Sequence, residues 1–253
     1  MKLIEWKISD EIEAYTTTRY DEDQLFNIGF NDRNNEEVLN NRKKLAKYLN
    51  TDLDHMVAPQ QRHTTNFKEV TLKDGGKGMY CKEDAIENTD ALYTRDPDLY
   101  LITFHADCCP VLLYCKDQKI VAAIHSGWRG TVNEIVAKVS SHLITNENCN
   151  PKEIYAYIGP SIEQRNFEAM DDIIDLVKQM SFDTSSYYKI KDEKHYLLDS
   201  KGLIKKQLLQ SGIPEGHITI SPYCTIEDED LFFSYRREKG NNRNMTIIKR
   251  KEL

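Results

Sequence analysis

Three short apolar runs, separated by polar turns, stand at the centre of the chain. Such runs are typical of buried strands. They are Leu99–Phe104, Val111–Tyr114 and Ile120–Ile124. From Val132 onward, apolar residues recur at intervals of three and four, which predicts a helix with one buried face. Thr131 and Glu134 have the spacing of a capping box, so we expect this helix to begin at Thr131.

The other apolar segments predict strands and helices that interleave irregularly. Further strands are expected at Leu3–Ile8, Glu13–Arg19, His55–Gln61, Phe67–Leu72, Met79–Cys81, Glu153–Ile158, His217–Ile220, Leu231–Ser234 and Met245–Ile248. Further helices are expected at Glu36–Leu49, Glu168–Met180 and Asp199–Leu209. Asn31–Asn35 is interpreted as a polar loop, and Lys73–Gly78 as a glycine-rich connection between strands. The irregular order favours one α/β (α+β) domain over residues 1–253, with mixed sheets and flanking helices.

The second and third central runs are predicted to form a hairpin that brings a thiol close to an imidazole. With Lys116 and Asp117 as the loop residues, Cys108 lies directly opposite His125. With Asp117 and Gln118 in the loop, the two residues become diagonal neighbours. In either register the side chains approach each other where a sheet meets the start of a helix. Pro110 has no N–H to donate and therefore marks an edge or the end of a ladder.

Charge, apolar content and cysteine usage argue against several classes of protein. The net charge of −7 argues against nucleic acid as a partner, and no apolar run is long enough to span a membrane. The first residues show no secretory signal, and six unevenly spaced cysteines are typical of reduced thiols. We therefore expect a cytoplasmic protein, either a monomer or a weak homo-oligomer.

Cys108 and His125 are the best candidates for chemistry, and three interpretations remain open. They are a structural pair in the core, a Cys–His dyad in which the imidazole generates a nucleophilic thiolate, or two ligands of a metal. Catalytic zinc has three protein ligands and one open position. His63, just beyond a predicted strand, is one of only seven histidines in the chain.

Two motifs in the centre of the chain resemble the signature of the laccase-domain family. They are Ala106–Leu113 and Val121–Thr131, and weaker matches follow the family's order along most of the sequence. The family includes peptidoglycan editing factors and purine nucleoside phosphorylases. The resemblance implies an α/β fold shared distantly with cysteine-dependent toxin deamidases. It also implies a zinc site formed by His63, Cys108 and His125, which would be both the metal ligands and the catalytic residues.

The activity implied by the resemblance is phosphorolysis of adenosine, inosine and methylthioadenosine, together with adenosine deamination. Zinc would activate water or polarise the substrate. His105 stands where the family commonly has threonine. Its offset of three from Cys108 along a strand directs it to the opposite face, as does the offset of one for Cys109, so we do not expect either residue to bind the metal.

Four residues are candidates for binding nucleoside and phosphate. Arg129 precedes the predicted start of a helix, where an oxyanion is favoured, and Arg236 is a second cation for the phosphate. Asn27 and Gln61 have amides that suit ribose or base, although capping and loop bonds would use them equally well. We expect Trp128 to belong to the core rather than to stack on a substrate.

Three other functions remain as alternatives. The first is a copper-dependent polyphenol oxidase, the activity behind the family's name, because two histidines and one cysteine also suit copper. Seven histidines without a His-x-His motif are too few for a multicopper centre. The second is a metal-independent Cys–His amidohydrolase that edits peptidoglycan precursors. The third is a binding protein without catalysis, which would tolerate the loss of His125.

Overall fold

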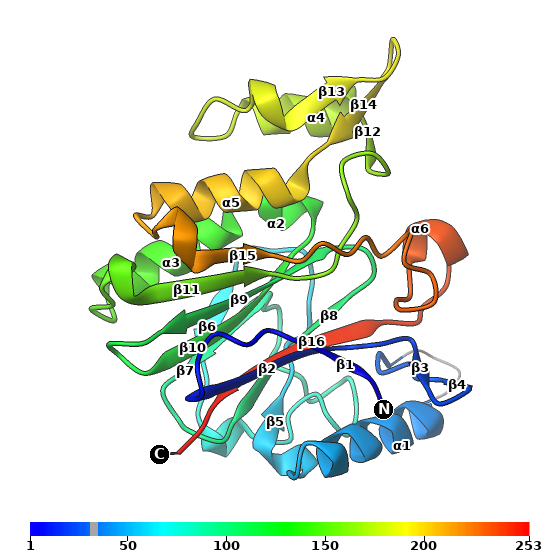
Figure 1. Cartoon of the computed structure of the whole chain (residues 1–253), viewed down its shortest axis with the longest axis vertical. Coiled ribbons are helices and arrows are strands. Elements are labelled where there is room, and N and C mark those ends of the chain that lie inside the picture. Colours follow the sequence, from blue (N-terminus) through cyan, green and yellow to red (C-terminus); the bar gives the residue numbers. More distant parts are fainter. Residues whose placement is uncertain (31–34, 253) are drawn as a thin grey trace.

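Two β-sheets face each other in the computed structural model of the chain (Figure 1), which describes residues 1–30 and 35–252. The first sheet contains, in spatial order, β1 (Leu3–Glu5), β2 (Ile12–Thr17), β16 (Asn244–Arg250), β8 (Tyr100–His105) and β5 (Met56–Val57). The second contains β15 (Ile218–Ile220), β11 (Ile154–Ile158), β9 (Cys109–Cys115), β10 (Ile120–Ser126), β7 (Ala91–Thr94) and β6 (Phe67–Glu69). Both sheets mix parallel and antiparallel pairs, which confirms the predicted fold class.

Helices cover the outer faces of both sheets (Figure 1). The helices of the described residues are α1 (Asn35–Tyr48), α2 (Trp128–Val132), α3 (Ile135–Thr145), α4 (Asp171–Lys178), α5 (Ser200–Gln210) and α6 (Tyr235–Glu238); α4 lies in a separate lobe and α6 at the side of the molecule. α1 packs on the first sheet, and α3 and α5 pack on the second. Among the described residues, no helix combines the length and the apolar character that a membrane span requires.

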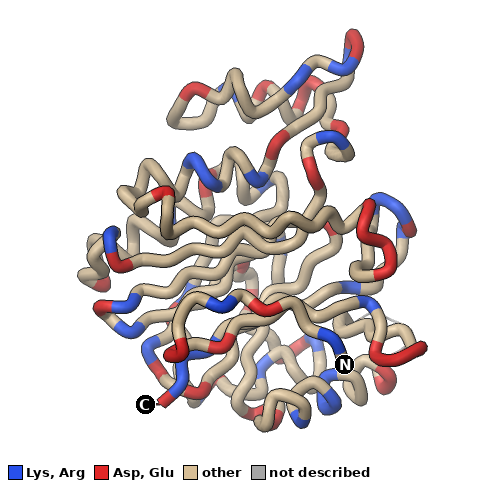
Figure 2. The backbone as a smooth tube through the Cα atoms, viewed as in Figure 1, with Lys and Arg blue, Asp and Glu red and all other residues tan. Residues whose placement is uncertain are grey.

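The alternation of side chains along the central strands explains why the two sheets stack. On β10, Val121 and Ala123 point between the sheets, whereas Ile120, Ala122 and Ile124 point toward α3. Because both faces of β9 and β10 are buried, these strands are continuous apolar runs in the sequence. Charged residues lie mainly in the turns, the helices and the outer strands, as Figure 2 shows.

A small lobe extends from the stack above α5 (Figure 1). It is built from α4 and a three-stranded sheet of β12 (Glu168–Met170), β14 (His195–Leu198) and β13 (Tyr188–Ile190). Its apolar residues pack with Val132 of α2 and Leu203 of α5 in one cluster. A two-stranded ribbon, β3 (Tyr20–Asp21) with β4 (Gln24–Leu25), completes the strands in the described part of the chain.

Several predicted elements were wrong or too long. The segments Met79–Cys81 and Leu231–Ser234 contain no strand, and the expected strand His55–Gln61 is reduced to β5. The expected helix Glu168–Met180 begins as strand β12 and becomes helical only at Asp171. The polar loop predicted at Asn31–Asn35 lies outside the described residues, except for Asn35, which begins α1.

The capping box predicted at Thr131 and Glu134 was also wrong. The helix begins three residues earlier, with Gly127 as its N-cap, and stops at Val132. Glu134 has a left-handed backbone, with φ of 58°, and a second helix starts after it. Its carboxylate accepts hydrogen bonds from the backbone N–H and the hydroxyl of Ser181, so it ties α3 to the small lobe instead of capping a helix.

Candidate metal centre and its cavity

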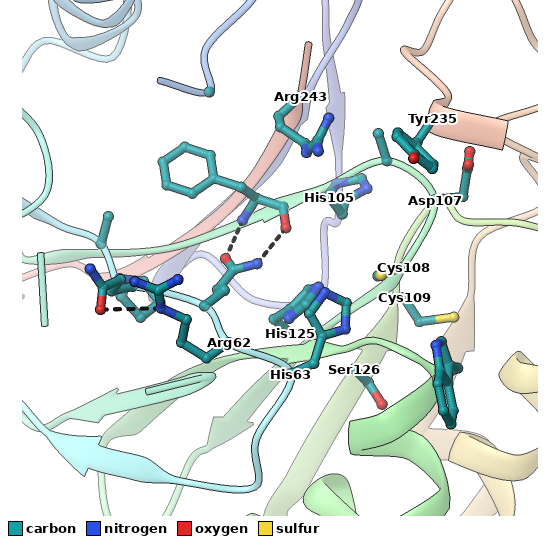
Figure 3. A pocket seen from close by; sticks show the side chains of 18 of the residues that line it. Arg62, His63, His105, Asp107, Cys108, Cys109, His125, Ser126, Tyr235 and Arg243 are labelled. Atoms are coloured by element: carbon teal, nitrogen blue, oxygen red, sulfur yellow. Dashed lines mark hydrogen bonds between the residues drawn. The ribbon is translucent and has the colours of Figure 1, made fainter. Parts of the chain in front are cut away.

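His63, Cys108 and His125 come together from three separate segments (Figure 3). His63 lies in the connection between β5 and β6, Cys108 immediately precedes β9, and His125 is near the end of β10. One ligand atom from each residue lies within 4.8 Å of the other two. The two imidazole rings meet edge to face, with centroids 4.9 Å apart. A thiolate and two imidazoles at this separation form a donor set suited to a divalent metal.

The hairpin that carries two of these groups has the second of the two registers considered above. His125 pairs with Pro110, and Cys108 is therefore its diagonal neighbour rather than its direct partner. Of the two registers predicted, the one with Asp117 and Gln118 in the loop is therefore confirmed, because the turn is centred one residue further along the chain than in the other. Pro110 lies next to the last pair of this ladder, as its missing N–H led us to expect.

Asp90 supports the centre, and the sequence analysis gave it no role. It lies directly before β7 and is completely buried. Its Oδ1 accepts a hydrogen bond from Nδ1 of His125 at 2.9 Å, which leaves Nε2 of that ring available for a metal. A carboxylate behind a ligating histidine fixes the tautomer and the direction of the ring. In the sequence, Asp90 is only an acidic residue at the edge of an apolar segment. It indicates a role only once the structure shows that its side chain is buried.

The same carboxylate holds His63 in a left-handed backbone conformation with φ of 60°. Asp90 accepts hydrogen bonds from the backbone N–H groups of Arg62, His63 and Thr64, at 2.8–3.1 Å. A non-glycine residue with this φ needs surrounding contacts that stabilise it. A single buried side chain therefore orients one histidine through its ring and the other through its backbone.

Gly127 gives the centre the space that it needs. A Cβ atom at this position would lie 2.4 Å from Nδ1 of His63 and 3.2 Å from Sγ of Cys108. The backbone φ of −69° suits any residue, so the requirement for glycine is one of space rather than conformation. Gly127 is also the N-cap of α2.

Burial and charge change the protonation of the three groups that surround the site. Burial opposes ionisation of Asp90, but the hydrogen bond and charge of His125, together with the hydrogen bonds from Thr64, lower the pKa to about 2. Burial likewise opposes protonation of His125, yet Cys108 and Asp90 raise its pKa to about 9. Burial and the nearby His125 lower the pKa of His63. Its Nδ1 is buried and has no hydrogen-bond partner among the described residues, as expected for an atom that faces a metal.

A cavity of about 620 Å³ opens onto the centre. This volume is in the range of pockets for small organic ligands. Five cationic side chains line it, namely Arg42, Arg62, Lys82, Arg236 and Arg243. Asp107 is the one carboxylate among the lining residues of the described chain. The cavity thus carries positive charge in a chain whose net charge is −7.

Two predicted substrate contacts have their amides bonded to the backbone. Gln61 lines the cavity, but its amide bonds in both directions to the backbone of Phe104, at 2.7 Å each. Asn27 does not line the cavity. Its Oδ1 accepts from the backbone N–H groups of Gly29 and Arg243, two residues that do. These amides position the walls of the cavity.

The two predicted phosphate contacts differ in location. Arg236 lines the cavity, and its guanidinium donates to the backbone carbonyl of Glu168. Arg129 is exposed and is not a lining residue; its guanidinium lies 4.3 Å from the ring centroid of Trp128. Trp128 is half-buried, packs against the apolar cluster of the small lobe and also forms part of the cavity wall.

His105 and Cys109 do not belong to the group of three ligands. Nε2 of His105 lies 2.9 Å from the hydroxyl of Thr246, and the ring is buried in the wall of the cavity. Cys109 donates to the hydroxyl of Ser161, and burial raises the pKa of its thiol to about 12. Neither residue competes with Cys108 for a metal at this centre.

Comparison with known proteins places the chain among related sequences. The family described as multi-copper polyphenol oxidoreductase laccase matches residues 13–251. The purine nucleoside phosphorylase YlmD of Bacillus subtilis is 34% identical over 217 residues, which are 85% of this chain and 78% of that protein. The crystal structure of the hypothetical protein YfiH of Bacillus licheniformis superposes with a TM-score of 0.93 and 33% identity, covering 96% of this chain and 94% of the other. The crystal structure of YlmD from Geobacillus stearothermophilus gives a TM-score of 0.92 and 30% identity, covering 96% and 93%.

Proposed function

The chain belongs to the family described as multi-copper polyphenol oxidoreductase laccase, and we propose that within it this protein is a zinc-dependent purine nucleoside phosphorylase. Its substrates would be adenosine, inosine and methylthioadenosine, with adenosine deamination as a second activity. The observation that carries the proposal is the meeting of His63, Cys108 and His125 on a cationic cavity large enough for a nucleoside and phosphate. The relatives named purine nucleoside phosphorylase support it.

Different residues of this chain would have different roles in such a reaction. When bound, zinc would supply a Lewis acid that polarises a substrate group or activates water. Asp90 holds the ring of His125 in one tautomer, so that Nε2 keeps its direction during turnover. The apolar wall formed by Trp128, Ile162 and Phe167 suits the flat face of a purine. We propose that all three ligand residues are required for catalysis.

Phosphorolysis replaces the C–N bond between ribose and purine by a C–O bond to phosphate. Phosphate must therefore enter the cavity as an anion, and the cationic lining attracts it. Arg236 is our proposed contact near the opening of the cavity, because it is exposed and lines the wall. Arg129 lies outside the lining and would act on the approaching anion from a distance. Gln61 and Asn27 would contribute by holding the walls in place.

The test combines an assay and a metal analysis on the same sample. Purified protein is given adenosine and phosphate, and ribose 1-phosphate, adenine and inosine are followed. Substituting Cys108→Ala should abolish both bound zinc and nucleoside turnover. Cys81→Ala is the matched control, because Cys81 is exposed and does not line the cavity. Full phosphorolysis by Cys108→Ala would remove the cysteine from the mechanism.

Two alternatives are each favoured by one observation. Two imidazoles and a thiolate also suit copper, so a copper-dependent polyphenol oxidase is the second candidate. Elemental analysis of protein purified without added metal distinguishes copper from zinc. The contiguous arrangement of Cys108, His125 and Asp90 would also serve a metal-independent amidohydrolase acting on peptidoglycan precursors. That activity would persist with a chelator and disappear on thiol alkylation.

A further inference from the structure

Arg42 is a buried cation that has no counter-ion among the described residues. It lies in α1 and is 1% exposed. Nε donates to the carbonyl of Ile28 at 2.8 Å, and Nη1 donates to the carbonyls of Gly78 and Met79. Nη2 has no acceptor in the described part of the chain. These carbonyls fix the position of the guanidinium, and no carboxylate of residues 1–30 or 35–252 pairs with its charge.

An unbalanced buried charge is unfavourable, which suggests that Arg42 has a ligand. Charged groups inside proteins are normally paired or bound to an ion. Burial lowers the pKa of Arg42 to about 9. Asp84 acts on it only from a distance, because its carboxylate is exposed and accepts a hydrogen bond from the backbone N–H of Gly78. The fold therefore maintains this charge at a cost in stability.

The surroundings direct the free edge of Arg42 into the cavity. Its guanidinium carbon lies 3.8 Å from the ring centroid of Phe30 and 4.9 Å from that of Phe104. Rings that stack on a guanidinium occupy its faces and leave its edges for hydrogen bonds. Two of its three nitrogens are used by carbonyls. Because Arg42, Phe30 and Phe104 all line the cavity, the remaining nitrogen is the one available to a ligand there.

The neighbouring cations indicate the charge of that ligand. Arg62 and Lys82 are exposed and line the same cavity, and neither takes part in an ion pair with a described residue. Nε of Arg62 is 3.4 Å from Oε1 of Gln60, a neutral partner. Three cations line this cavity without a carboxylate partner among the described residues, which favours an anion with several oxygens. Guanidinium groups bind tetrahedral oxyanions well.

We propose that Arg42 anchors inorganic phosphate in the cavity. This subsite rests on the proposed phosphorylase function, in which phosphate is the second substrate. Arg62, Lys82 and Arg236 are all exposed, and they add positive charge along the lining of the cavity. No such role was predicted for Arg42, because the helix pattern does not show whether an arginine beside the apolar face is buried or exposed.

The first experiment measures binding of inorganic phosphate to the metal-loaded full-length protein by calorimetry. Arg42→Gln keeps two donors for the carbonyls but removes the charge, and it should weaken phosphate binding by about 30-fold or more. Inosine binding should change less than about threefold. Arg165→Gln is the matched control, since Arg165 is exposed and pairs with Glu227 away from the cavity lining. Equal phosphate affinity in Arg42→Gln and the wild type would overturn the proposal.

A second experiment does not depend on the folding of a variant. Crystals of the wild-type protein are soaked in tungstate, a heavy mimic of phosphate, and its anomalous scattering is located. The proposal requires tungstate within hydrogen-bond distance of Nη2 of Arg42, and tungstate elsewhere or absent contradicts it. If phosphate binds at Arg42 but no nucleoside is cleaved, the subsite stands and the proposed function fails.

Discussion

Substituting Asp90→Asn tests whether one carboxylate organises the metal centre. Oδ2 of Asp90 accepts from the backbone N–H groups of Arg62 and Thr64 and from the hydroxyl of Thr64, whereas Oδ1 accepts from His63 and His125. The amide of asparagine has one oxygen and one NH₂. With the oxygen placed toward His125, the NH₂ faces two backbone N–H groups that cannot accept a hydrogen bond.

The expected loss of stability in Asp90→Asn follows from the number of hydrogen-bond donors that lose their acceptor. Each buried unsatisfied donor costs about 1–3 kcal/mol, and the charge-assisted bond to His125 also becomes weaker. We therefore expect the free energy of unfolding without metal to fall by about 3–5 kcal/mol, which most domains of this size survive. Metal affinity should fall about 10–100-fold, because the two histidines lose their orientation.

Urea unfolding of the metal-free protein and competition with a chromogenic chelator measure the two effects. Asp96→Asn is the matched control: Asp96 also accepts a backbone N–H bond, from Leu72, but at an exposed site, where we expect a loss below about 1 kcal/mol. If Asp90→Asn keeps wild-type stability and wild-type metal affinity, the role assigned to this carboxylate is wrong.

Three further predictions concern space, protons and charge at the centre. Gly127→Ala should displace the ring of His63 and lower metal affinity at least about tenfold, while the far-ultraviolet circular dichroism spectrum changes little. Unchanged metal affinity would show that the ring can move without loss of binding. The pKa of His125 is about 9, so an incoming metal has to displace the proton of this ring at neutral pH. Apparent metal affinity should therefore rise about tenfold per pH unit from pH 7 and level off above pH 9. A flat pH profile, measured by chelator competition, would refute this. Arg236→Gln should raise the KM for phosphate more than Arg129→Gln, because only Arg236 lines the cavity; the reverse order in steady-state assays would contradict that placement.

The predictions from sequence succeeded where burial alone decides whether a segment forms a strand. Burial on both faces makes β9 and β10 continuous apolar runs, so their hairpin and the approach of Cys108 to His125 were visible in the sequence. His63 was proposed only from the family resemblance, because a single histidine after a strand carries no signal of its own. Its distance from the other two ligands is set by tertiary structure.

Two of the wrong predictions share a physical cause, which is that side chains replaced the expected backbone contacts. The apolar segment Leu231–Ser234 resembles a strand, but the amide of Asn244 bonds to both the N–H and the carbonyl of Phe233 in place of a neighbouring strand. Glu134 bonds to Ser181 rather than to a helix start. Such contacts between distant segments cannot be derived from local periodicity.

The position of β16 has a consequence for synthesis of the protein. This strand, Asn244–Arg250, lies between β2 and β8 in the first sheet, although some 230 residues separate it from β2 along the chain. The three candidate metal ligands therefore emerge from the ribosome long before the middle strand of the sheet exists. Until that strand leaves the exit tunnel, the nascent chain holds ligands capable of binding metal on an incomplete scaffold with two open strand edges.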